Sequence, residues 1–133
     1  MSIEMSTALW TLLIAALMPV VCAGISKAGA TDRYDNRNPR DWLARREGYR
    51  ARAYAAQQNS WEALIVFTAG LAAAFMGGAD PAAIGTVAVI FTVARIAYLA
   101  CYLADLATLR SLVWLVGFGS CICLIVMGAQ NAA

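Results

Sequence analysis

Two charged side chains, Glu62 and Arg95, lie inside long apolar segments of the sequence, where charge is not expected. On insertion scales a charged side chain at the centre of a bilayer costs at least about 2.5–3.5 kcal/mol, so each one requires a partner or a function. Counted inward from the expected membrane boundary, each lies roughly 10–13 Å deep. The two can therefore meet at one depth, and we expect them to neutralise one another.

Other polar residues accompany these two charges at helical spacing and at the same end of the apolar segments. The whole set is Arg52, Gln57, Asn59, Glu62, Arg95, Tyr98, Tyr102, Arg110 and Ser111. In one segment members recur at i, i+7 and i+10, and in the next at i, i+3 and i+7, so each group shares one face of a helix. Together they outline a polar pocket that could hold a ligand with both carboxylates and an ammonium group.

Each of these residues also has a purely structural interpretation. A Glu62–Arg95 pair could fix the register of two helices, and Asn59 could form an interhelical hydrogen bond. The two tyrosines could belong to an aromatic belt at the membrane boundary, and Arg110 could be a headgroup anchor. The convergence of all of them at one depth and one end favours the binding pocket.

The elements that must position these residues are four membrane-spanning helices. The chain has 133 residues, 62% of them hydrophobic, and a mean hydropathy of +0.65, whereas about 45–50% apolar residues is usual in soluble domains. A span needs about 20 mostly apolar residues. We therefore expect one all-α domain over residues 1–133, a four-helix membrane bundle. Its spans are expected at about 6–26, 53–76, 81–103 and 109–127, with an outer loop at about 27–52.

Basic residues are concentrated in that outer loop. Of the ten Lys and Arg residues, all except Arg95 and Arg110 lie within 27–52. The positive-inside rule predicts that this loop is cytoplasmic and that both termini lie on the opposite side, in the inner membrane if the protein is bacterial. Acidic residues interrupt the arginines and apolar spans flank them, so nucleic acid is not an expected partner, whereas membrane lipids are.

Capping chemistry predicts two helix starts. Asp41 is expected to cap the helix that leads into the second span, and Asp80 followed by Pro81 is expected to begin the third. The connection between the third and fourth spans, about residues 104–108, is short, so these two spans should pack as antiparallel neighbours.

The cysteines and the lack of histidine argue against a metal site. Cys22, Cys101, Cys121 and Cys123 lie in or beside apolar stretches, without CxxC spacing. We expect buried thiols that pack as small hydrophobic side chains and no metal cofactor.

Several motifs in order along the chain resemble one family. They are Asn38-Pro39-Arg40-Asp41 after the first span, Arg52-Ala53 leading to Gln57-x-Asn59-x-x-Glu62 in the second, Arg95-x-x-Tyr98-x-x-x-Tyr102 in the third, and Arg110-Ser111 in the fourth. Over most of its length the chain therefore resembles the membrane-associated proteins in eicosanoid and glutathione metabolism (MAPEG), and in particular the microsomal glutathione transferase type.

That resemblance implies a homotrimer of four-helix protomers that binds glutathione as co-substrate between adjacent protomers, near the cytoplasmic side. It implies that the tripeptide is held by Asn59, Glu62, Tyr98 and Tyr102, with Gln57 supplied by a neighbouring protomer. By the same resemblance Arg95 supports Glu62 or the charge of the ligand.

The resemblance further implies a transferase or peroxidase. Arg110, helped by Ser111, would stabilise the glutathione thiolate, because a nearby guanidinium lowers the pKa of a thiol. The thiolate would attack a lipophilic electrophile or hydroperoxide that enters from the lipid. Arg110-Ser111 thus favours an enzyme.

The chain departs from the family pattern at Ala55. Family members usually carry an arginine at this position, four residues before the asparagine that Asn59 matches. Arg52, one turn earlier, could take its place by reaching inward. Ala55 therefore favours the alternative, a non-catalytic structural or lipid-binding member of the family.

Overall fold

The protein is all-helical, and four of its helices are long and apolar enough to cross a membrane. The computed structural model describes residues 3–132, with side chains from residue 5 onward. The four long helices are α1 (Ile3–Lys27), α3 (Gly48–Met76), α4 (Pro81–Leu103) and α5 (Ala107–Asn131), and the short α2 (Pro39–Ala44) precedes α3. The predicted all-α, multi-pass membrane bundle is confirmed.

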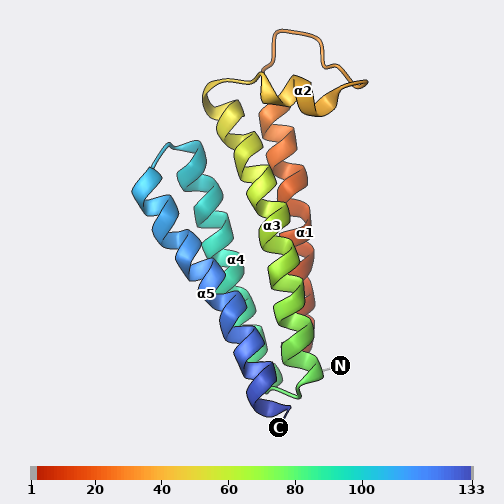
Figure 1. Cartoon of the computed structure of the whole chain (residues 1–133), viewed down its shortest axis with the longest axis vertical. Helices are drawn as coiled ribbons and strands as arrows, with labels where there is room; N and C mark the ends of the chain where they lie inside the picture. Colours follow the sequence, from red (N-terminus) through yellow and green to blue (C-terminus); the bar gives the residue numbers. More distant parts are fainter. Residues whose placement is uncertain (1–2, 133) are drawn as a thin grey trace.

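The long helices run back and forth and pack as two neighbouring pairs (Figure 1). α1 packs along α3 and α4 packs along α5, while α3 also contacts α5 and α1 contacts α4. The short α4–α5 connection predicted an antiparallel hairpin, and this is confirmed. α2 and the α4–α5 turn lie at one end of the bundle, called here the loop end. The α3–α4 turn and the outer ends of α1 and α5 lie at the opposite end.

Three of the long helices, α1, α3 and α5, are longer than the expected spans, whereas α4 has the expected bounds, and one cap differs. α3 begins at Gly48, where a φ of 59° lets the chain turn into the helix, so Arg50 and Arg52 are already helical. Asp80 caps α4 as predicted, because its Oδ2 accepts a hydrogen bond from the Ala83 N–H at 3.1 Å. The prediction for Asp41 is wrong. Pro39 occupies the first turn of α2, so the cap position falls on Asn38 and Asp41 lies inside the helix.

The core is apolar and aromatic, and the outer surface is apolar as well. Phe67 of α3 and Phe91 of α4 stack with ring centroids 3.9 Å apart in the middle of the bundle. Large apolar side chains such as Ile65 and Val93 are exposed, with 71% and 61% of their surfaces accessible. Apolar side chains on the outside are what a lipid environment requires of a spanning helix.

The cysteines are free thiols that are mostly buried. Cys22, Cys101 and Cys121 are buried, as expected for thiols that pack as small hydrophobic groups, whereas Cys123 is exposed on α5. The expectation of a buried thiol is therefore wrong for Cys123. It lies two residues after Cys121 on α5, and residues two apart on a helix lie on different faces.

At the opposite end, α3 and α5 make direct main-chain contact. A Cβ atom added at Gly128 would meet the main chain of Ala73, and one added at Gly77 would meet the main chain of Gly128. Only glycine allows two helices to approach so closely. These residues hold the bundle together at the end away from the polar side chains.

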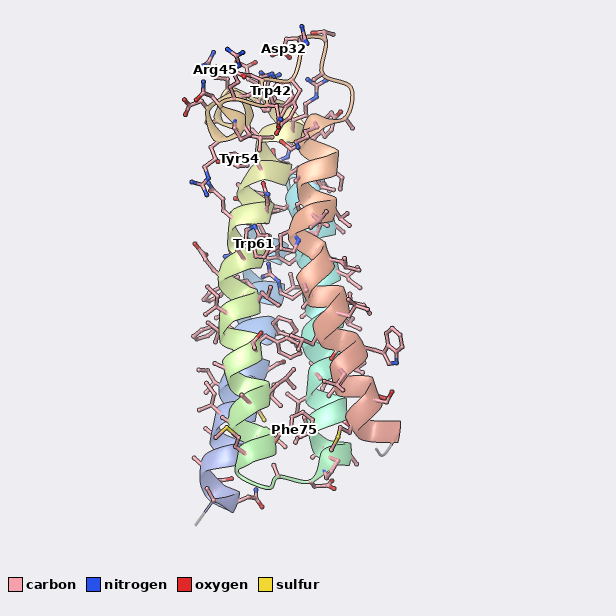
Figure 2. All side chains as sticks on the ribbon, turned by 90° about the vertical axis from the view of Figure 1, so that its right-hand side faces the viewer. Asp32, Trp42, Arg45, Tyr54, Trp61 and Phe75 are labelled. Atoms are coloured by element: carbon pink, nitrogen blue, oxygen red, sulfur yellow. The ribbon has the colours of Figure 1, made fainter. Side chains whose placement is uncertain are left out.

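The segment between α1 and α3 is ordered around one ion pair at the loop end. Arg46 donates from Nη2 to Asp32 Oδ2 at 2.8 Å, and its Cζ lies 3.8 Å from the centre of the Trp42 ring. Tyr34 packs edge-on against Trp42. The Arg46 guanidinium holds the pKa of the Asp32 carboxyl below its ordinary value. Figure 2 shows Asp32, Trp42 and Arg45 together at this end of the bundle.

Candidate functional site

Polar residues from α3 and α4 meet in a partly open cavity that is lined by α3, α4 and α5. The cavity has a volume of about 110 Å³. Its polar lining consists of Asn59, Glu62 and Arg95, and its aromatic lining of Phe91, Trp114 and Phe118. The structure therefore brings three of the predicted site residues to one space, with polar and apolar walls.

Arg95 is a buried cation at the centre of this arrangement. Only 3% of its surface is exposed. Its Nη2 donates to Ser60 Oγ at 3.5 Å, and its Cζ lies 4.2 Å from the centre of the Tyr98 ring. Gly117 on α5 leaves room for the stem of this side chain, since a Cβ added there would lie 3.5 Å from Arg95 Cδ.

The predicted ion pair between Glu62 and Arg95 is wrong. Among the described residues the only salt bridge joins Arg46 and Asp32. Glu62 is exposed and accepts a hydrogen bond from Asn59 Nδ2 at 3.2 Å, as residues three apart on one helix can do. Arg95 is likewise engaged by Tyr98, three residues along its own helix. Glu62 is thus bonded within its own helix, whereas Arg95 contacts Tyr98 on its own helix and Ser60 on α3, and the two charges line one cavity.

Aromatic rings continue from Arg95 toward the loop end. Tyr98 and Tyr102 are in edge-to-face contact with centroids 5.5 Å apart, and Arg110 Cζ lies 4.2 Å from the centre of the Tyr102 ring. The order Arg95–Tyr98–Tyr102–Arg110, called here the cation–ring row, crosses from α4 to α5. Each cation–ring contact contributes about 0.5–2 kcal/mol, depending on exposure. The predicted shared face of Arg95, Tyr98 and Tyr102 is therefore present.

Three predicted site residues lie apart from this group. Ser111 is exposed, and its Oγ donates to the Ala107 carbonyl within α5 at 3.1 Å. Arg52 donates from Nε and Nη2 to the carbonyl of Leu103, at 3.3 and 3.0 Å. Gln57 lines an open hollow on the outer surface of α3, which also includes Glu62.

Two amide oxygens on α3 lack partners within the described chain. Asn59 Oδ1 and Gln57 Oε1 are both buried from solvent and accept no hydrogen bond there. A buried acceptor without a donor costs about 1–3 kcal/mol, so such groups normally have a partner in the functional state. Asn59 lines the cavity and Gln57 the outer hollow, while Glu62 lines both. Tyr54 and Trp61 border the same hollow, along the loop-end half of α3 (Figure 2).

Sequence reasoning missed part of the site. Ser60 escaped notice because a serine in a membrane helix is common, yet it bonds Arg95. Trp114, Gly117 and Cys121 line the cavity and follow Arg110 at i+4, i+7 and i+11, which is one face of α5. That spacing was a signal available in the sequence.

Comparison with known proteins identifies the family of the chain. No curated protein and no solved structure matches the chain. The MAPEG family matches residues 7–130, a range that includes the cavity and the cation–ring row. Four of its helices are long and apolar enough to span a membrane. The chain therefore belongs to the MAPEG family.

Proposed function

We propose that the protein is a glutathione-dependent membrane transferase or peroxidase. Family membership points to the glutathione and eicosanoid chemistry of membranes. The observation that carries the proposal is the cation–ring row, which leads from Arg110 near the loop end to Arg95 beside the cavity. Such a row offers positive charge and phenolic groups along a path that a short anionic peptide can occupy.

The polar groups complement those of glutathione, which carries two carboxylates, one ammonium, two peptide amides and a thiol. Glu62 can accept from the ammonium, and Arg95 can donate to a carboxylate. The unpartnered oxygens of Asn59 and Gln57 can accept from peptide N–H groups. Arg110 lies beside Tyr102, where its guanidinium can stabilise the thiolate.

A homotrimer is part of this proposal, because one protomer offers an incomplete site. Ligand pockets for molecules of this size are about 300–1,000 Å³, whereas the cavity has about 110 Å³. Gln57 lines the outer hollow of α3 and is not part of the cavity lining, whereas Glu62 lines both. A neighbouring protomer packed on this surface would enlarge the site and supply the second wall. Membrane lipids and the lipophilic substrate would contact the exposed apolar faces.

The proposed chemistry begins with the thiolate as nucleophile. In transfer, sulfur bonds to an electrophilic carbon, the electron pair of the broken bond departs with the leaving group, and the thiol proton passes to water. In peroxide reduction, sulfur attacks one peroxide oxygen, and the O–O bond breaks to give an alcohol and a glutathione sulfenic acid. A second glutathione then yields the disulfide and water.

Binding and turnover measured on purified protein test this function. Millimolar glutathione should raise the thermal midpoint of unfolding, and the protein should conjugate an activated aryl chloride or reduce an organic hydroperoxide. Chemical cross-linking at low density should give a trimer as the largest product. A protein that neither binds glutathione nor turns over either substrate class would contradict the proposal.

A non-catalytic family member is the second candidate, and one observation favours it. Ala55 provides no guanidinium, and the Arg52 guanidinium is already bonded to the Leu103 carbonyl. This alternative predicts that glutathione or lipid binds and that neither substrate is turned over.

A further inference from the structure

Arg52 completes the hydrogen bonding at the end of α4. The Leu106 N–H bonds to the Cys101 carbonyl, and the Asp105 N–H bonds to the Tyr102 carbonyl, in the pattern that often ends a helix. The carbonyl of Leu103, the last helical residue, receives instead the Nε and Nη2 of Arg52, at 3.3 and 3.0 Å. A cation at a helix C-terminus is also favoured by the helix dipole.

These bonds join α3 to the α4–α5 hairpin at the loop end. In the part of the chain from residue 5 to 132, side chains link α3 to this hairpin by hydrogen bonds at two places. One is Arg52 to Leu103, and the other is the longer bond from Arg95 to Ser60. Arg52 therefore contributes the shorter and better placed connection, next to the α4–α5 turn.

The turn that Arg52 holds is tight and determines where Arg110 lies. Only residues 104–106 separate α4 from α5, and Asp105 adopts a φ of 60°, a conformation that aspartate enters at some cost. Tyr102 directly precedes Leu103, and its ring contacts the Arg110 guanidinium. A shift of the α4 end relative to α3 would displace both residues from Asn59 and Glu62.

We propose that Arg52 is a positioning residue for Arg110, and that it is not a ligand for glutathione. Through the Leu103 carbonyl it keeps Tyr102 and Arg110 in register with Asn59 and Glu62, which lie seven and ten residues along its own helix. This inference rests on the proposed function, because it assigns Arg52 a role in forming the bound thiolate.

Arg50 gives a matched control on the same helix. It too is an arginine whose guanidinium bonds a main-chain carbonyl, but it bonds that of Gly29, two residues after the end of α1. Arg50→Gln and Arg52→Gln thus remove the same charge two residues apart, and only the second releases the α4–α5 turn.

The test compares both variants with wild type in full-length purified protein. Three quantities are measured: amide hydrogen exchange at residues 104–110, the pH at which half of the bound thiolate absorbance appears, and the dissociation constant of S-methylglutathione, which has no ionisable thiol. In Arg52→Gln we expect exchange at least about tenfold faster. We also expect the pH midpoint to lie about one unit higher. At a pH below the midpoint, this shift corresponds to about tenfold less bound thiolate than in wild type. Affinity for S-methylglutathione should stay within about threefold of wild type. Arg50→Gln should change none of the three.

Each other outcome contradicts the inference. A tenfold or larger loss of S-methylglutathione affinity with an unchanged pH midpoint would make Arg52 a ligand. Unchanged exchange and an unchanged midpoint would show that the bond positions nothing. If wild type forms no bound thiolate, the proposed function fails first, and the role of Arg52 fails with it. Should Arg52→Gln not fold, Arg52→Lys, which keeps the charge and loses the planar fork, should give an intermediate midpoint. A wild-type midpoint in that variant would overturn the assignment.

Discussion

Glu62 and Arg95 line the same cavity without forming an ion pair. Glu62 is held by Asn59, three residues before it, and Arg95 by the Tyr98 ring and Ser60. A buried guanidinium without a carboxylate is expensive in a membrane span, and its retention there is a sign of function. The charge of Arg95 is then available to an incoming anionic group, and Glu62 to an incoming cation.

Glu62→Gln should leave stability nearly unchanged and weaken glutathione binding. The side chain is exposed and loses no buried counter-ion, so we expect a change within about 0.5 kcal/mol. Loss of the partner for the ligand ammonium should lower affinity by about 10–100-fold, the usual range for a charged hydrogen bond. Thermal unfolding and calorimetric titration measure the two effects. A fall of several kcal/mol in stability would instead indicate that Glu62 is paired within the assembly.

Arg95→Met should be at least as stable as wild type and should bind glutathione poorly. Methionine fills similar space and removes the free-energy cost of a buried charge. We expect this cost to be larger than the stabilisation lost with one cation–ring contact and one long hydrogen bond. Arg95→Ala is the control. It also removes the charge, but it leaves a void and should lose stability by about 2–5 kcal/mol relative to Arg95→Met. If Arg95→Met unfolds more readily than Arg95→Ala, the result would contradict the claim that methionine fills the space of the Arg95 side chain.

Gly128→Ala should destabilise the bundle, whereas Gly119→Ala on the same helix should not. The added methyl at residue 128 would meet the main chain of Ala73, which cannot move aside as a side chain can, whereas at residue 119 nothing lies within 4 Å. We expect a loss of about 1–3 kcal/mol for the first. The second should be neutral or stabilising by up to about 1 kcal/mol, because alanine favours the helix. Equal thermal midpoints for the two variants would argue against the close α3–α5 crossing.

The segment between α1 and α3 should loosen in acid. Arg46 lowers the pKa of Asp32, so this pair stabilises the segment above the ordinary aspartate pKa of about 3.9 and loses that contribution as pH falls through the lowered value. Hydrogen exchange of residues 28–47, compared between pH 6 and pH 3 after correction for the intrinsic rate, should show this loss. Asp32→Asn should already exchange quickly at pH 6 and change little with acid. A wild-type segment equally protected at pH 3 would contradict the role of the ion pair.

The sequence predicted the parts of the fold that depend on local pattern. Hydropathy predicted four spans, the Asp80-Pro81 pair predicted the start of α4, and helical spacing placed Arg95, Tyr98 and Tyr102 on one face. What it could not predict was the choice among partners at similar distance. The depths of the two residues allowed Glu62 to meet Arg95, but Glu62 bonds Asn59 on its own helix, and Arg95 contacts Tyr98 and Ser60. The bond from Arg52 to Leu103 joins residues that are far apart in the chain, so no local sequence pattern predicts it.

The bound glutathione thiolate is the most direct measure of the proposed function. Arg110 is the cation at the outer end of the cation–ring row and contacts Tyr102. Arg45, an exposed arginine at the loop end, supplies the control. The measurement is the ultraviolet difference absorbance of purified protein with glutathione at neutral pH. The proposed function predicts a thiolate band in wild type and in Arg45→Ala, and its loss in folded Arg110→Ala. No band in wild type, together with no thermal stabilisation by millimolar glutathione, would contradict it.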